Sequence, residues 1–354
     1  MGLSSNASNV LLAKCRARFG KRLTMQDVNT LVGCHTVSEV ASYLKANTHY
    51  GQALENTDTT AIHRRELEST LRSYLFEDLS SLCRYELSVG EWFSDYILMR
   101  GEIQQIISYL RLFSAGRQNE FIFSLPAFYM QHLDLDIQAL ASAKTYKDFL
   151  SAMRRSRFIK VLRTFTPDSG EPVDIAMIEH ALYRQFYENI DGIISRHYSG
   201  SALDELRDIM STQQDILNFC HLYRMKKYYH AEPASIRAWM LGSGSNIRSG
   251  KMNAMIEAPG ADKALELFMS TSYGRLTDLG KLENGGIEAA TSPVIFSKAL
   301  RYLRSSVNPT TVMLSFINIA ETELQDVVSF IEGVHYGLAP GSILNMTTID
   351  NFYD

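Results

Sequence analysis

Apolar residues recur along the chain at the spacing of an α-helix. In residues 102–113 (EIQQIISYLRLF), one apolar stripe occupies positions i, i+3, i+4 and i+7 and consists of Ile103, Ile106, Ile107 and Leu110. This spacing puts the four side chains on one face, which predicts an amphipathic helix with one buried side. No stretch alternates apolar and polar residues strongly enough to predict a sheet, so the expected fold class is all-α.

The same stripe recurs twice more, in residues 215–226 (DILNFCHLYRMK) and 323–334 (ELQDVVSFIEGV). Each copy opens on a carboxylate, and these are Glu102, Asp215 and Glu323, at intervals of about 110 residues. A carboxylate is favourable in the first turn of a helix, where the helix dipole is positive. We therefore expect the three carboxylates to lie at helix starts, and their matching register indicates an internal repeat.

A second recurring motif consists of a small hydroxyl residue, one spacer and an aromatic residue. It reads Thr48-His49-Tyr50 in the first third of the chain, Ser156-Arg157-Phe158 in the middle and Thr271-Ser272-Tyr273 in the last third. A short helical pattern precedes each copy, so we expect the motif to close a helix. Gly51 and Gly274 follow the first and third copies, where each suits a helix C-terminal cap with a left-handed backbone.

Both motifs keep the same order and nearly the same spacing, which predicts three helical units of roughly 110 residues. We place the units at residues 1–115, 116–228 and 229–354 and expect them to share faces in one compact molecule. We also expect the repeated helices to lie at equivalent heights about a common pseudo-axis. The aromatic residues of this repeat signature are Tyr50, Phe158 and Tyr273.

The composition is that of an ordinary globular protein and disfavours two kinds of function. Of the 354 residues, 45% are hydrophobic and 21% are charged, and the formal net charge is -4. This balance argues against a nucleic-acid-binding protein that depends on neutralising phosphates. No run approaches the roughly 20 apolar residues that span a bilayer, so we expect a soluble or peripheral protein.

No motif for catalysis or ligand binding is complete. The glycine-rich stretch 242–251 (GSGSNIRSGK) has Ser245 where a phosphate-binding loop needs glycine, and Met252 where it needs Ser or Thr. We interpret it as a flexible loop. The spacing of cysteine and histidine residues fits no metal site. We therefore predict no catalytic residue, no cofactor and no metal ion, with an enzyme of unrecognised site as an alternative.

The most basic aromatic run is residues 224–230 (RMKKYYH). Cations favour the C-terminal end of a helix, so a solvated helix end is the expected structure. Contact with RNA or with acidic lipids is the alternative.

Four stretches of the chain share a pattern with one known family. They are residues 13–24 (AKCRARFGKRLT), which run into a Leu-Thr-x-x-Asp turn, 37–51 (VSEVASYLKANTHYG), 101–113 (GEIQQIISYLRLF) and 321–343 (ETELQDVVSFIEGVHYGLAPGSI). In their order, spacing and threefold recurrence they resemble the C/d subunit of V/A-type (vacuolar/archaeal-type) rotary ATPases and ATP synthases. The resemblance covers nearly the whole chain.

This resemblance implies a funnel-shaped, all-α fold of three units related by pseudo-threefold symmetry. In that family the wide mouth receives the central stalk and the base rests on the membrane proteolipid ring. The chain would then be a non-catalytic rotor subunit that couples ATP turnover to proton or sodium transport. Its partners would be the central-stalk subunits and the ring, with membrane contact only through the ring, on the cytoplasmic face.

A helical-repeat scaffold unrelated to rotary motors is the main alternative, since it would also consist of repeated helices. Common helical solenoids repeat at roughly 34–47 residues. The interval of about 110 residues disfavours this interpretation.

Overall fold

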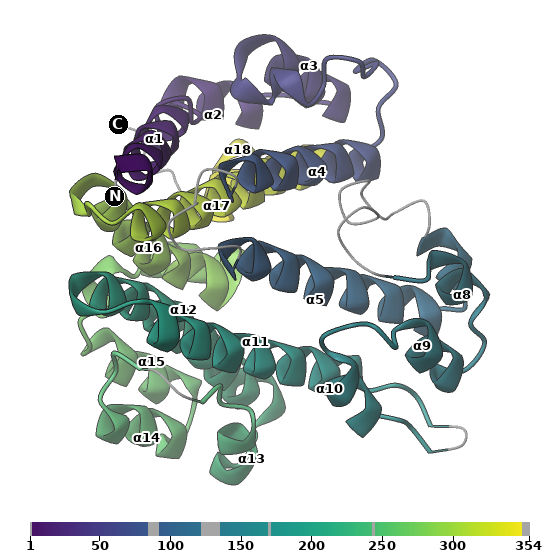
Figure 1. The fold of residues 1–354 in the computed structure, drawn as a ribbon, viewed down its shortest axis with the longest axis vertical. Coiled ribbons are helices and arrows are strands. Elements are labelled where there is room, and N and C mark those ends of the chain that lie inside the picture. Colours follow the sequence, from purple (N-terminus) through teal and green to yellow (C-terminus); the bar gives the residue numbers. More distant parts are fainter. Residues whose placement is uncertain (1, 84–91, 122–134, 169–170, 243–244, 349–354) are drawn as a thin grey trace. The chain divides into compact units, whose positions relative to one another are not determined.

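The computed structural model describes residues 2–83, 92–121, 135–168, 171–242 and 245–348. Within these ranges the protein consists of α-helices, short 3₁₀ helices and connecting turns, without a strand, which confirms the all-α prediction (Figure 1). Two compact parts can be distinguished. Unit 1 comprises Met1–Val89, His197–Met240 and Gly244–Asp354, and unit 2 comprises Gly90–Arg196 and Leu241–Ser243.

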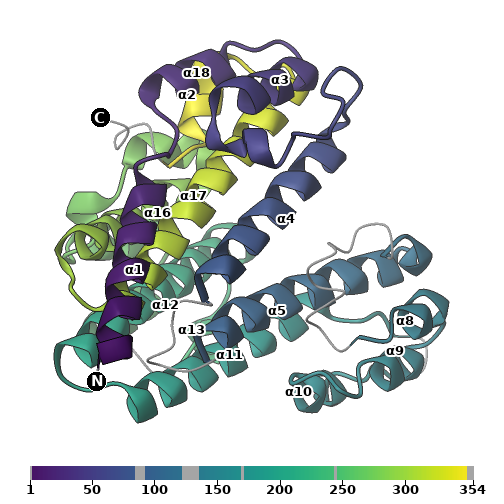
Figure 2. The same ribbon diagram turned by 45° about the horizontal axis from the view of Figure 1, so that its top comes forward.

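Unit 1 is organised around long helices. These are α1 (Gly2–Phe19), α4 (Arg64–Cys83), α12 (Gly200–Tyr229), α16 (Leu282–Ser305) and α17 (Pro309–His335). The shorter elements are α2 (Met25–Val32), α3 (Val37–Asn47), η1 (His49–Gln52), α13 (Pro233–Ala238), α14 (Ser249–Glu257), α15 (Ala261–Met269), η3 (Gly274–Leu276), η4 (Leu279–Lys281) and α18 (Pro340–Asn345). Helix α17 packs against α16, α1 and α4, so the last long helix of the chain contacts the first elements of the sequence (Figure 2).

Helix α17 forms the core of unit 1. Every residue from 310 to 319 is buried, so this half of the helix has no solvent-facing side. A helix that is covered all round must satisfy its polar side chains internally. The Ser315 hydroxyl donates to the Thr311 carbonyl, and the Asn318 amide donates to the Leu314 carbonyl. Gln213 of α12 in turn donates to the side-chain oxygen of Asn318 and ties α12 to α17.

Unit 2 contains α5 (Trp92–Ser114), η2 (Gln118–Glu120), α8 (Ile137–Ser142), α9 (Tyr146–Ala152), α10 (Ile159–Thr164) and most of α11 (Ile175–His197). An aromatic cluster holds the end of α5 to the short helices. The Tyr109 ring stacks on Phe149 with ring centroids 5.2 Å apart and meets Phe121 edge-on. The Tyr109 hydroxyl donates to the Leu140 carbonyl, so the buried phenol is satisfied.

The order of elements recurs along the chain. In each third of the chain two short helices and a tight turn precede two long helices, with α10 added in the middle third and α13 and η4 in the last, and α2, α8 and α14 begin at intervals of about 110 residues. An apolar residue lies two positions before each of these starts, and these are Leu23, Leu135 and Ile247. The turn that carries Thr48 and Tyr50 follows α3, and the corresponding turns follow α9 and α15.

The expectation that the repeated carboxylates lie at helix starts is wrong. Glu102 lies inside α5, Asp215 inside α12 and Glu323 inside α17. Each is at least two turns from the helix N-terminus, beyond the reach of the dipole effect that motivated the prediction. The amphipathic stripes were identified correctly, but apolar and polar residues N-terminal to them also adopt helix, which extends each helix well upstream.

The expected left-handed caps at Gly51 and Gly274 are also wrong. Positive φ among the glycines that the structure describes occurs at Gly116, Gly200, Gly286 and Gly337. Gly51 and Gly274 instead lie in the 3₁₀ turns η1 and η3. A Cβ atom would stand 2.5 Å from the Lys45 carbonyl oxygen at the first position, and 2.0 Å from the Met269 carbonyl oxygen at the second. Glycine is therefore required for close approach to the end of the preceding helix.

Because Gly274 lies so close to the preceding helix, a methyl group added there should lower the stability of the fold, whereas one added at an open position should not. Gly274→Ala should lower the free energy of unfolding by roughly 2 kcal/mol or more, because the clash is with backbone atoms that cannot rotate away. Gly250→Ala, at an exposed position of α14 with open space around it, should be neutral or stabilising by up to about 1 kcal/mol. Urea denaturation of both variants measures the difference. Equal effects of the two substitutions would contradict the assignment.

Candidate functional site

The three carboxylates of the recurring stripes are all buried. Glu102 is 3% exposed, Asp215 is 0% exposed and Glu323 is 4% exposed. Burying an ionisable carboxylate is costly unless hydrogen-bond donors surround it. Each of the three meets one of the hydroxyl–spacer–aromatic turns singled out in the sequence, which assigns the donors.

Glu323 of α17 is held by the N-terminal part of the chain. The Leu23 backbone N–H donates to its Oε2 at 2.9 Å, and the Tyr50 hydroxyl donates to its Oε1 at 3.2 Å. The His49 Nε2 atom lies 3.4 Å from the same Oε1. Residues about 300 positions apart therefore share one hydrogen-bonded cluster. Sequence reasoning had marked Glu323 and Tyr50 separately but had not paired them.

Burial changes the acidity of this cluster. It raises the pKa of Glu323 to about 7, against the opposing effect of the hydrogen bonds from Leu23 and Tyr50. Burial also lowers the pKa of His49 to about 4, so the imidazole is neutral at pH 7. The pKa of the Tyr50 phenol is raised well above its ordinary value, first by burial and then by the nearby Glu323 carboxylate. The phenol therefore stays a hydrogen-bond donor at any physiological pH.

Asp215 of α12 is held by two segments that follow it. The Tyr273 hydroxyl donates to its Oδ2 at 3.0 Å, and the Ser245 hydroxyl donates to Oδ1. The backbone N–H groups of Asn246 and Ile247 donate to Oδ2 at 2.8 and 3.2 Å. Burial raises the pKa of Asp215, while these four hydrogen bonds oppose the rise.

For residues 245–251 these contacts correct the interpretation of the stretch 242–251 as a flexible loop, and residues 243 and 244 lie outside the described residues. Ser245, Asn246 and Ile247 are tied to Asp215, and α14 begins at Ser249. The Asn246 side chain also donates to the Asp208 carboxylate at 2.9 Å. Glycine and serine content signalled a loop, but the sequence did not show that a buried carboxylate would fix its backbone.

Glu102 of α5 is held by the middle turn, within unit 2. The Ser156 hydroxyl donates to its Oε1, and the Arg157 Nε lies 3.2 Å from its Oε2. Phe158 replaces the tyrosine of the other two turns and cannot donate, so the hydroxyl and the guanidinium take over that role. Burial raises the pKa of Glu102, opposed by the Ser156 hydrogen bond and the Arg157 charge.

The three turns have one internal hydrogen bond in common. The Thr48 oxygen accepts from the Tyr50 N–H at 3.2 Å, the Ser156 oxygen from the Phe158 N–H at 3.1 Å and the Thr271 oxygen from the Tyr273 N–H at 3.2 Å. A hydroxyl that binds the amide two residues on forms a compact local turn. This explains why the motif needs a small hydroxyl residue, one spacer and then the aromatic residue.

The pairing follows a cyclic order. The first turn meets the last carboxylate, Glu323; the second turn meets the first carboxylate, Glu102; and the third turn meets the second carboxylate, Asp215. The sequence singled out the three carboxylates and the three aromatic residues, but neither this order nor the additional contacts from His49, Arg157 and Ser245. The backbone donors Leu23 and Ile247 each stand two positions before a short helix, and no sequence motif had indicated them.

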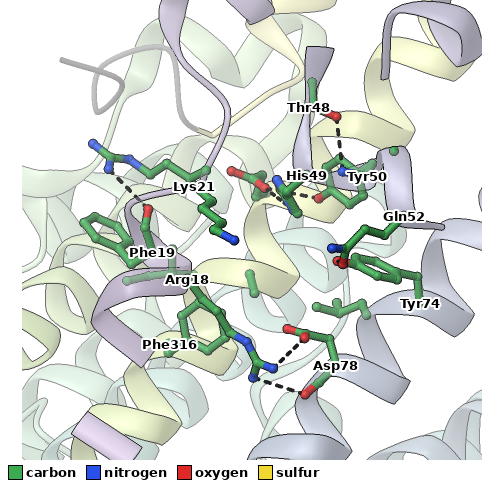
Figure 3. Close-up of a pocket in the computed structure, with 16 residues that line it drawn as sticks. Arg18, Phe19, Lys21, Thr48, His49, Tyr50, Gln52, Tyr74, Asp78 and Phe316 are labelled. Atoms are coloured by element: carbon green, nitrogen blue, oxygen red, sulfur yellow. Dashed lines mark hydrogen bonds and ion pairs between the residues drawn. The ribbon is translucent and has the colours of Figure 1, made fainter. Parts of the chain in front are cut away.

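A cavity of about 540 Å³ adjoins the Glu323 cluster in unit 1. It lies between the end of α1, the η1 turn, α4 and α17, and Figure 3 shows Thr48, His49 and Tyr50 along one of its sides. Two of its lining residues, Arg18 of α1 and Asp78 of α4, form an ion pair at 2.9 Å. The cavity is therefore lined both by the first elements of the chain and by α17.

Each carboxylate cluster ties a turn to a long helix, and we call such a cluster a joint. Every carboxylate oxygen named above accepts hydrogen bonds or lies beside a nitrogen of the protein itself. Among the described residues, no group of three or more His, Cys, Asp and Glu side chains is arranged to hold a metal ion. No described helix is long and apolar enough to span a bilayer.

Comparison with known proteins gives one consistent family. The model of the family vATP-synt_AC39, described as ATP synthase (C/AC39) subunit, matches residues 11–346. The C subunit of the A-type ATP synthase of Methanosphaera stadtmanae is 23% identical over 264 residues, 75% of this chain and 66% of that relative's length. The protein of the same name from Methanothermobacter thermautotrophicus is 22% identical over 332 residues, which are 89% of this chain and 80% of the relative.

The raised pKa of Glu323 predicts a pH-dependent stability difference. A carboxyl group whose pKa rises from 4.5 to about 7 on folding stabilises the protein below pH 4.5, and this contribution is lost as the pH rises to 7. Glu323→Gln keeps one acceptor oxygen, for either Leu23 or Tyr50, and does not titrate. Relative to the variant, the natural protein should lose up to about 3 kcal/mol of unfolding free energy between pH 4.5 and 7.5.

Urea denaturation at several pH values measures this difference. Glu66→Gln, at an exposed position of α4, serves as the matched control and should keep the pH dependence of the natural protein. The assignment is refuted if Glu323→Gln and Glu66→Gln have parallel stability profiles across this pH range.

Proposed function

Because the chain belongs to the ATP synthase (C/AC39) subunit family, we propose that it is a non-catalytic rotor subunit of a V/A-type ATPase or ATP synthase. In this role it joins the central stalk to the membrane proteolipid ring and transmits torque between ATP turnover and proton or sodium transport. The observation that carries the proposal is the match of the family model along residues 11–346, nearly the whole chain. The curated relatives, both named as C subunits of A-type ATP synthases, support it.

We propose that the fold is a triplicated helical unit, with copies at residues 1–115, 116–228 and 229–354 arranged as a funnel about a pseudo-threefold axis. The threefold recurrence of element order supports this arrangement. So does the cyclic pairing of turns with carboxylates, because a chain of three equivalent units closes only when its last unit binds its first. The Glu323–Tyr50 contact is the one expected for that closure.

The three carboxylate joints suit a part that bears torque. A rotating connector must keep its shape under load, and packed helices with buried, fully hydrogen-bonded polar groups resist deformation. Breaking one joint would leave a buried carboxylate without donors, which costs several kcal/mol. The joints therefore oppose sliding of the three proposed helical copies relative to one another.

The proposed partners are the central-stalk subunits, in the wide mouth, and the proteolipid ring, at the base. The proposed location is the cytoplasmic face of a membrane, with membrane contact only through the ring. The absence of a membrane-spanning helix among the described residues is compatible with a peripheral position. The slightly acidic net charge of -4 fits docking to protein partners better than binding to nucleic acid.

Purification of the intact complex tests the proposed role. An affinity-tagged copy of the chain, expressed in its native cells and solubilised in mild detergent, should co-purify with the catalytic head, the central stalk and the proteolipid ring. Membranes from cells that lack the chain should retain ATP hydrolysis by the head but lose ATP-driven ion uptake. Ion uptake is measured with a fluorescent pH or sodium indicator in sealed vesicles.

Re-expression of the natural chain provides the control and should restore ion uptake. Co-purification with unrelated proteins and without ATPase subunits would favour a helical-repeat scaffold and overturn the proposal. Normal ATP-driven ion uptake in membranes without the chain would refute the coupling role specifically.

A further inference from the structure

The two ends of one N-terminal segment meet at a single carboxyl group. This segment, residues 20–52, comprises the turn after α1, helices α2 and α3, and the η1 turn. Near its start the Leu23 N–H donates to Oε2 of Glu323 at 2.9 Å, and near its end the Tyr50 hydroxyl donates to Oε1 at 3.2 Å. The protonation state of Glu323 therefore acts on both ends of the N-terminal segment at once.

The N-terminal segment also has hydrogen bonds of its own. The Thr24 N–H donates to the Asp27 carboxylate at 2.7 Å at the start of α2. The Tyr43 hydroxyl of α3 donates to the same carboxylate at 2.8 Å and so ties α3 to α2. Both helices pack on α17. Proteins open locally in compact units of this kind, so the N-terminal segment has the internal bonds it needs to move as one body relative to α17.

Among the three buried carboxylates, Glu323 has the least support from donors and cations. Asp215 accepts four hydrogen bonds. Glu102 lies 3.2 Å from the guanidinium of Arg157. Glu323 accepts two hydrogen bonds, and the basic group at ion-pair distance among the described residues is His49, at 3.4 Å. Since the His49 imidazole is neutral at pH 7, a negative charge on Glu323 is compensated less than a charge on the other two.

Charged and titratable groups of several elements surround this cluster. They are Lys21 and Arg22 after α1, Asp27 of α2, His49 and Tyr50 of η1, Tyr74 of α4 and Asp326 of α17. The Arg22 charge favours the ionised form of Glu323, and the Asp27 charge opposes it. Arg18 and Asp78 line the same cavity and pair with each other at 2.9 Å, and Figure 3 shows this pair apart from His49 and Tyr50.

Most of these groups keep one charge state between pH 5 and pH 8. Burial lowers the pKa of His49 to about 4 and raises the pKa of both tyrosines. Against the opposing effect of burial, hydrogen bonds from Thr24 and Tyr43 lower the pKa of Asp27. Burial raises the pKa of Asp78, opposed by the charge of Arg18. Asp78 is therefore the group from which an experiment has to distinguish Glu323.

We propose that Glu323 is a proton switch for the N-terminal segment, which packs on α17 while this carboxyl group is protonated and opens more often once the group is ionised. A protonated carboxyl group has no charge to desolvate and still accepts from Leu23 and Tyr50. An ionised carboxylate regains its hydration when the segment opens. The cavity of about 540 Å³ that Glu323 lines gives water and protons access to it. This inference concerns the chain itself and is independent of the rotor function.

The direction of the pH effect follows from linkage. The carboxyl group has its ordinary pKa of 4.5 when hydrated, and burial raises the pKa of Glu323 to about 7 in the packed state. The stabilisation by the bound proton is complete below pH 4.5 and is lost as the pH rises to 7. The equilibrium constant for opening should therefore rise at least about tenfold between pH 5 and pH 8.

Hydrogen exchange of the full chain, followed by mass spectrometry at pH 5 and pH 8, tests the proposal. Each rate is divided by the intrinsic rate at that pH. Protection of the amides of residues 20–52 should fall at least about tenfold from pH 5 to pH 8. At pH 8 these amides should also be at least about tenfold less protected than those of α16, which exchange through wider unfolding.

Variants assign the effect to one carboxyl group. In Glu323→Gln the protection of residues 20–52 should change less than about twofold between the two pH values, because the amide does not titrate. Asp78→Asn is the matched control in the same cavity and should keep the pH dependence of the natural chain. Tyr50→Phe removes a donor to the ionised form, so it should increase opening more at pH 8 than at pH 5. This third variant tests the switch even if Glu323→Gln does not fold.

Four results would overturn the inference. Protection of residues 20–52 that is the same at both pH values would exclude a switch, and protection equal to that of α16 would show that the segment opens only with the rest of the protein. An unchanged pH dependence in Glu323→Gln, or its loss in Asp78→Asn, would assign the proton to another group. An equal effect of Tyr50→Phe at both pH values would show that its hydrogen bond does not depend on the charge of Glu323.

Discussion

Burial of a carboxylate in the middle of a helix is the constraint on which this structure depends. Inside α5, α12 and α17 the backbone amides are already used by the helix, so the donors for Glu102, Asp215 and Glu323 must come from other segments. The segment that supplies them is fixed in position, because a misplaced donor would leave a charge unpaired. Each carboxylate therefore determines which turn packs against its helix.

The same constraint connects parts of the sequence that are far apart. Glu323 accepts hydrogen bonds from the Tyr50 hydroxyl and the Leu23 amide. The long helix α17 is therefore bonded to the N-terminal part of the chain. Asp215 fixes the backbone from Ser245 to Ile247 and thereby sets where α14 begins. The burial that makes these contacts strong also raises the pKa of both carboxyl groups, which links their protonation to the stability of the joint.

A subunit of a rotary ATPase gains from joints of this kind. For the rotor function proposed above, torque transmission needs a body that neither shears nor loosens, and the three carboxylate clusters tie a turn to a long helix at three places. The cavity at the Glu323 cluster is lined by cations and carboxylates together, namely Arg18, Lys21 and Arg22 with Asp78 and Glu323.

The sequence alone determined the all-α class, the repeat signature and the family. Periodic stripes and recurring motifs are local patterns, and helix periodicity and turn chemistry follow from neighbouring residues. Only the tertiary structure decided that Glu102, Asp215 and Glu323 lie within helices, that Gly51 and Gly274 permit close approach, and that each turn binds a particular carboxylate. These features depend on which distant segment fills the space beside a residue, and a buried charge needs a partner only once the chain has packed around it.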